Sequence, residues 1–106
     1  MIIVNLSETE KFINIEVSGH GDDTDQSCAR VSTVCDCIQL FFSKMFDNYV
    51  KEHGYTYLCM NKVKLREKGL EPQLFKILVY FIELEKLYPK SIKIKTKGES
   101  TNGKNN

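Results

Sequence analysis

The stretch that decides the fold spans residues 12–42, with the sequence FINIEVSGHGDDTDQSCARVSTVCDCIQLFF. Its first part, residues 12–17, alternates apolar and polar side chains, the period of two that is typical of a half-buried strand. Residues 18–25 contain two glycines and no large apolar side chain, which predicts a loop. Apolar side chains then recur every three or four residues, the pattern of an amphipathic helix. The stretch therefore predicts a strand, a polar loop and a helix in that order.

Further strands are expected on both sides of this stretch. Residues 1–6 form a short apolar run, which predicts a strand that pairs with residues 12–17 across a polar connection. Residues 49–60 are rich in aromatic and β-branched side chains and have His53 and Gly54 near their centre, which predicts a hairpin. We therefore expect one hairpin before the first helix and another after it.

The last third of the chain predicts a connection, a second helix and a final strand. Residues 61–70 are charged and contain Gly69, so we expect them to form a connection. Pro72 suits the first position of a helix, which Pro89 then ends. Isoleucines that alternate with lysines after Pro89 predict the last strand. The resulting order β-β-α-β-β-α-β predicts an α+β fold, a two-layer sandwich with a five-stranded sheet and two helices.

Length and charge limit the domain organisation and the class of partner. With 106 residues the chain has room for one domain, which we assign to residues 1–96, and we expect the polar residues 97–106 to be a disordered tail. The 15 basic and 14 acidic residues nearly cancel, which predicts no nucleic-acid-binding surface. No apolar run approaches the ~18 residues that cross a membrane, and the N-terminus lacks the basic region of a signal peptide. We therefore expect a cytoplasmic protein.

Three of the four cysteines are expected to have structural roles, and no metal or cofactor is predicted. Cys35 and Cys37 would lie about 200° apart around the helix axis, so they cannot share a metal ion. The sequence contains no C-x-x-C pair. We expect one of these two thiols to pack in the core and the other to lie near the surface, and Cys59 to be a buried thiol in a strand.

Cys28 differs because it falls in the first turn of the expected helix. The helix dipole favours a thiolate there, and the free N–H groups of the first turn can hold a developing oxyanion. His20 lies eight residues earlier, at the end of a strand, and the intervening loop can bring its imidazole to the thiol. A Cys–His pair is the minimal activated nucleophile for acyl transfer. The spacing also fits a cysteine in a capping region beside an ordinary loop histidine, which is the simpler interpretation of spacing alone.

Other polar residues near this pair have simple structural interpretations. Asp25 and Ser27 are both candidates for the N-cap of the helix. Asp25 is also a candidate to orient His20 as a third member of the site, although the cap is its simpler role. His53 falls in a hairpin turn and is interpreted as a solvated turn residue. Cys35 lies ~10 Å along the helix axis from Cys28, too far for a disulfide, which argues against a redox switch.

The string SGHGDDTDQSCARVS, residues 18–32, resembles the G-H…D-x-x-C-A-x-x-S signature of the ribosomal-processing cysteine protease (Prp) family. The residues that carry this resemblance are Gly19, His20, Asp25, Cys28, Ala29 and Ser32. The expected order of strands and helices is also similar to that of the family over nearly the whole chain. Two positions depart from the signature, since Gly21 stands where the family often has Ala or Ser, and Arg30 replaces a small residue.

The resemblance implies a homodimeric cysteine endopeptidase. Such enzymes remove the N-terminal extension of the large-subunit ribosomal protein numbered twenty-seven, after a pair of phenylalanines. On this resemblance Cys28 is the nucleophile and His20 the general base, with Gly19, Asp25 and Ser32 in supporting roles. The expected partners are the ribosomal protein precursor and a second copy of the chain. The alternative is a non-catalytic, ribosome-associated protein-binding module on the same fold.

Overall fold

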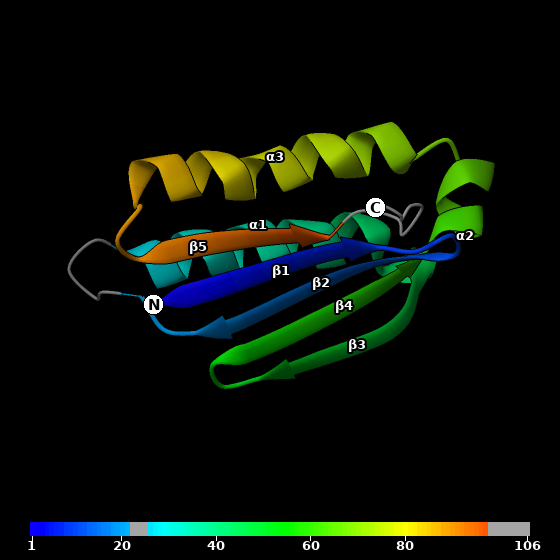
Figure 1. Cartoon of the computed structure of the whole chain (residues 1–106). Coiled ribbons are helices and arrows are strands. Elements are labelled where there is room, and N and C mark those ends of the chain that lie inside the picture. Colours follow the sequence, from blue (N-terminus) through cyan, green and yellow to red (C-terminus); the bar gives the residue numbers. More distant parts are fainter. Residues whose placement is uncertain (22–25, 98–106) are drawn as a thin grey trace.

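The computed structural model describes residues 1–21 and 26–97, which form one five-stranded mixed sheet with its helices (Figure 1). The strands are β1 (Ile2–Glu8), β2 (Phe12–Gly19), β3 (Phe46–Glu52), β4 (Tyr55–Asn61) and β5 (Ile92–Lys97). The helices are α1 (Ser27–Phe42), the short 3-10 helix η1 (Ser43–Met45), α2 (Lys62–Glu67) and α3 (Glu71–Leu87). The strand order is β3-β4-β2-β1-β5, with β1 and β5 parallel and the other neighbours antiparallel. The predicted α+β fold with two layers is confirmed.

The core lies between one face of the sheet and the two long helices. Ile13 and Ile15 of β2 are buried, as the period of two predicted, and they pack in one cluster with apolar side chains of both helices. From α1 this cluster contains Val31, Val34, Cys35, Ile38 and Phe42, and from α3 it contains Leu74, Leu78 and Phe81. Both helices therefore lie on the same side of the sheet, which gives the two layers.

The other face of the sheet is polar and carries its own hydrogen bonds. Glu16 accepts one from the hydroxyl of Tyr55 at 2.8 Å and one from the amide of Asn5 at 3.3 Å. The hydroxyl of Tyr57 donates to the side-chain oxygen of Asn14 at 2.9 Å. Because these polar side chains have partners beside them on the sheet, this face needs no covering layer.

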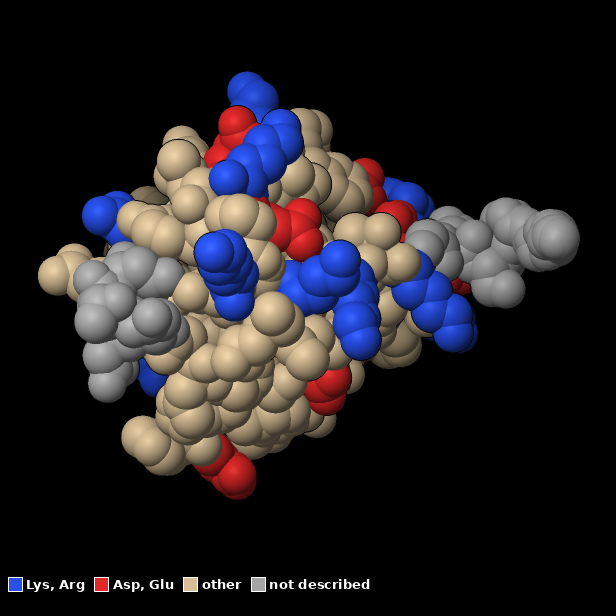
Figure 2. Space-filling view, turned by 60° about the vertical axis from the view of Figure 1, so that its left-hand side comes forward, with Lys and Arg blue, Asp and Glu red and all other residues tan. Residues whose placement is uncertain are grey.

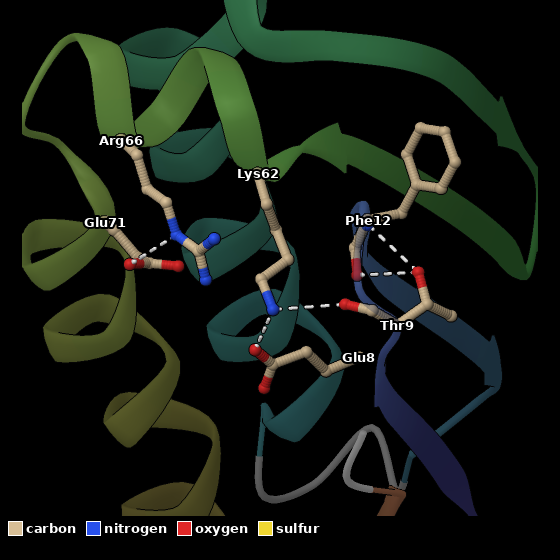
Figure 3. Close-up of polar contacts among 6 residues, drawn as sticks. All are labelled: Glu8, Thr9, Phe12, Lys62, Arg66 and Glu71. Carbon is tan, nitrogen blue, oxygen red and sulfur yellow. Dashed lines mark hydrogen bonds and ion pairs between the residues drawn. The ribbon is translucent and has the colours of Figure 1, made fainter. Parts of the chain in front are cut away.

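The segment expected to be a plain connection, residues 61–70, contains the helix α2. Asn61 caps this helix, since its side-chain oxygen accepts from the N–H of Lys64 at 3.1 Å. Lys62 is only 1% exposed, and its Nζ pairs with Glu8 and donates to the carbonyl of Thr9 at 3.1 Å (Figure 3). The charged composition of residues 61–70 led us to predict a connection and not a helix. One of these charged side chains, Lys62, is in fact buried against the β1–β2 connection.

The start of α1 also differs from the prediction. The residue before the helix is Gln26, which has a left-handed φ of 58° and makes no side-chain capping bond. Ser27 is the first helical residue and is buried, so it is not the N-cap that we predicted. The other cap candidate, Asp25, lies outside the described residues.

The C-terminal strand extends to Lys97, and the rest of the expected polar tail, residues 98–106, lies outside the described residues. Three exposed lysines of β5, Lys93, Lys95 and Lys97, alternate with Ile92 and Ile94. Figure 2 shows Lys and Arg side chains in a row across the face that it presents. No helix in the described part of the chain has the length and apolar character needed to span a bilayer.

Candidate active site

The end of β2 positions His20 through Gly19. This glycine has a φ of +92°, and a Cβ there would lie 2.2 Å from the carbonyl oxygen of Met1. Its N–H donates to the carbonyl of Gly54 at 3.0 Å, which ties the end of β2 to the turn between β3 and β4. Any residue with a Cβ at this position would push the end of β2 away from Met1, which precedes β1. Gly19 therefore fixes the point at which the chain leaves the sheet and places His20 beyond it.

Cys28 is the second residue of α1, and it is held by the loop that follows His20. The N–H of Gly21 donates to the Sγ of Cys28 at 2.8 Å. This contact holds the sulfur beside the loop that carries His20.

The close approach of the loop to α1 explains the glycine at position 21. A Cβ on Gly21 would lie 1.9 Å from the Oγ of Ser27 and 3.0 Å from Ile2. A side chain at this position would therefore push the loop away from the helix and lengthen the contact between the Gly21 N–H and the sulfur of Cys28. The departure from the Prp signature at this residue thus has a local structural reason in this chain.

One cavity of about 560 Å³ brings the predicted site residues together. Gly19, His20, Cys28 and Ser32 all line it, whereas Asp25 lies outside the described residues. Its apolar wall includes Ile2, Val17 and Val31. The cavity is formed by the first turns of α1, the end of β2 and the β3–β4 turn. A thiol and an imidazole therefore line the same space, and such a pair can carry nucleophilic catalysis on an acyl group when the two groups come within hydrogen-bond reach.

His53 is the site residue that sequence reasoning missed. It is exposed in the β3–β4 turn, as expected, but it also lines the cavity, and its ring centroid lies 5.0 Å from that of His20. The cause is the strand order. Because β4 pairs with β2, with Tyr55 opposite Ser18, the turn between β3 and β4 comes to the end of β2. Only a prediction of which strands are neighbours could have found this contact.

Two of the other thiols, Cys35 and Cys59, have surroundings that oppose ionisation. Burial, with a smaller contribution from Asp36, raises the pKa of the Cys35 thiol to about 12. Burial also raises the pKa of Cys59, and Cys37 is half-buried on the same helix as Cys35. As predicted, one of the two helix thiols is buried, which is Cys35, and Cys59 is a buried thiol in a strand. Among residues 1–21 and 26–97, no group of three or more His, Cys, Asp or Glu side chains is arranged to hold a metal ion.

Comparison with solved structures finds the same fold in other proteins. The ribosomal processing protease Prp from S. aureus, in complex with a substrate peptide, matches with a TM-score of 0.73 and 18% identity, over 92% of this chain and 100% of that one. The same protease with a covalently linked product peptide matches with a TM-score of 0.69 and 21% identity over the same shares. SMU.848 from Streptococcus mutans matches with a TM-score of 0.65 and 20% identity, over 93% of this chain and 96% of its own.

These likenesses agree with the resemblance that residues 18–32 carry. No protein-family model matches the sequence, and the search of curated proteins gave no match. At 18% to 21% identity, the likeness to the Prp structures concerns the three-dimensional arrangement. The likeness extends over 92% of this chain. The chain thus has the fold of the ribosomal processing protease Prp.

Proposed function

We propose that this protein is a cysteine endopeptidase in which Cys28 is the nucleophile and His20 the general base. The observation that carries the proposal is their common cavity, where the sulfur already accepts a hydrogen bond from Gly21. The fold shared with a protease supports it. Cys28 is half-buried and lines the cavity, unlike Cys35, which is buried and hard to ionise.

The proposed reaction has two steps. His20 takes the proton of Cys28, and the thiolate attacks the carbonyl carbon of the scissile peptide bond. Backbone N–H groups in the first turn of α1 stabilise the oxyanion, and His20 returns the proton to the leaving amine. A water molecule, activated by His20, then hydrolyses the thioester and regenerates the thiol. Gly19 serves this reaction by placing His20, and Ser32 forms part of the cavity wall next to Cys28.

The proposed substrate is the precursor of large-subunit ribosomal protein twenty-seven, cut after a pair of phenylalanines in its N-terminal extension. The apolar wall of Ile2, Val17 and Val31 supports this assignment, because aromatic side chains gain free energy when they leave water against such a surface. The solved structures with this fold include complexes of a protease with peptides. A ribosomal precursor as substrate implies that the enzyme acts in the cytoplasm.

We also propose that the active form is a homodimer. A groove of about 370 Å³ between α1 and α3 is lined by apolar side chains, among them Phe41 and Ile77, with Tyr80 beside them. Phe41 is 65% exposed and Tyr80 61% exposed, an unusual position for large aromatic side chains in a monomer. Sedimentation of the wild type and of Phe41→Asp tests this assignment, which predicts a dimer in the first case and a monomer in the second.

Cleavage of the extended ribosomal protein tests the proposed activity directly. The purified chain is incubated with the precursor, and the products are identified by mass spectrometry. We expect Cys28→Ala to lower the cleavage rate by at least about a thousandfold, because the nucleophile is lost, with thermal stability close to that of the wild type. Cys37→Ala, on the same helix, serves as the matched control and should cleave normally. Undiminished cleavage by Cys28→Ala would falsify the assignment, and binding of the precursor without cleavage by the wild type would favour a non-catalytic binding module.

A further inference from the structure

The turn between β3 and β4 makes two contacts with the ring of His20. The imidazole of His53 lies beside it, with the two ring centroids 5.0 Å apart and the ring planes inclined by 42°. The backbone of Gly54 lies close to the same ring, since a Cβ on Gly54 would be 3.0 Å from the Nε2 of His20. The turn is itself fixed to the end of β2 by the hydrogen bond from Gly19 to Gly54.

We propose that His53 is a positioning residue for His20, held in place by the β3–β4 turn. The inference rests on the proposed function, because it concerns the general base of that reaction. His20 is exposed just beyond the end of β2, and an exposed side chain can adopt several staggered rotamers unless a neighbour excludes them. The ring of His53 and the backbone of Gly54 occupy space around the imidazole. They exclude rotamers of His20 that would enter this space and so favour those that keep the imidazole in the cavity it shares with Cys28.

The size of the effect follows from the strength of aromatic contacts. A tilted pair at this centroid distance shifts a rotamer equilibrium by about threefold to tenfold. The same factor is expected in kcat, because only the positioned rotamer can take the proton of Cys28. Binding of the substrate does not use this contact, so KM is expected to stay unchanged. A residue that contacts the substrate instead would show the opposite pattern.

Two variants of His53 separate ring contact from loss of the side chain. We expect His53→Ala to lower kcat about threefold to tenfold at constant KM, and His53→Phe, which keeps a ring beside His20, to recover most of the loss. Glu10→Ala, an exposed change in the β1–β2 connection at the other end of the sheet, is the control for kinetics and thermal stability. Wild-type kcat in His53→Ala, an effect on KM alone, or equal losses in His53→Phe and His53→Ala would each overturn the inference.

A spectroscopic measurement distinguishes failure of this inference from failure of the proposed function. In the wild type we expect nuclear Overhauser contacts between the ring protons of His20 and His53, with a single χ1 rotamer for His20. In His53→Ala the χ1 of His20 should average over several rotamers. If the protein cleaves no peptide but shows these contacts, the proposed function fails. If it is active but the contacts are absent from the wild type, the positioning role fails.

Discussion

At the end of the sheet where β4 leads into α2, a buried ammonium holds the connections together, whereas at the other end glycines let the backbone pass close to the functional side chains. Lys62 fills the first end and reaches both Glu8 and the carbonyl of Thr9. At the second end Gly19 and Gly21 let the chain pass close to Met1 and Ser27, beside the cavity that His20 and Cys28 line. The difference shows that one end is built for stability, while the other keeps polar groups accessible.

The largest effect is expected at the stabilising end. Lys62→Ala removes the partner of the Glu8 carboxylate and leaves the Thr9 carbonyl without this donor, so we expect the free energy of unfolding to fall by about 3–5 kcal/mol. Urea denaturation measures it. Lys64→Ala is the matched control, because Lys64 is half-exposed and pairs with Asp47 only at 3.8 Å, and it should change stability by less than about 0.5 kcal/mol. Similar losses in both variants would show that the buried ion pair is not what holds this end.

The next effect is expected at the cavity end. In Gly21→Ala the new methyl group meets Ser27, so the loop must move away from α1, and we expect the cleavage rate to fall about tenfold to a hundredfold, with a loss of stability of about 1–3 kcal/mol. Kinetics and chemical denaturation measure the two quantities.

Gly69→Ala provides the control for this change. Gly69 has a φ of +67°, and a Cβ there would have no neighbour within 4 Å. Its substitution therefore costs only backbone strain, about 1–2 kcal/mol, and should leave the cleavage rate unchanged. Equal rates in Gly21→Ala and the wild type would show that the close approach of the loop is not required for the reaction.

The smallest effect concerns Cys35, which lies on α1 between the two ends. Its pKa is raised from 9.0 to about 12 in the folded protein, so the unfolded chain loses this proton first as the pH rises. The stability that depends on the neutral thiol is therefore complete below pH 9 and is lost progressively between pH 9 and about 12. Between pH 8 and 10.5 we expect the wild type to lose about 1–2 kcal/mol more than Cys35→Ala. Parallel pH dependences for the two proteins would contradict this.

The sequence allowed the prediction of those features that depend on local periodicity. The strand at residues 12–17 and the helix after residue 27 follow from the spacing of apolar side chains, and Gly19, His20 and Cys28 came together because they flank one loop. Helix α2 was missed because Lys62, a residue type that is usually exposed, is buried by a partner 54 positions away in the chain. His53 was missed because its contact with His20 depends on strand order, which periodicity does not determine.

The two edges of the sheet differ in a way that bears on assembly. At β5, the N–H of Ile94 donates to the carboxylate of Glu85 at 2.9 Å, so a side chain of α3 occupies a position where a neighbouring strand would bond. The exposed lysines of β5 add repulsion between copies. Strand β3 forms the opposite edge and ends at the cavity. At β3 one backbone donor is likewise taken by a side chain, since the N–H of Tyr49 donates to the side-chain oxygen of Asn48 at 2.9 Å. Growth of a fibre through both edges of the sheet is therefore hindered.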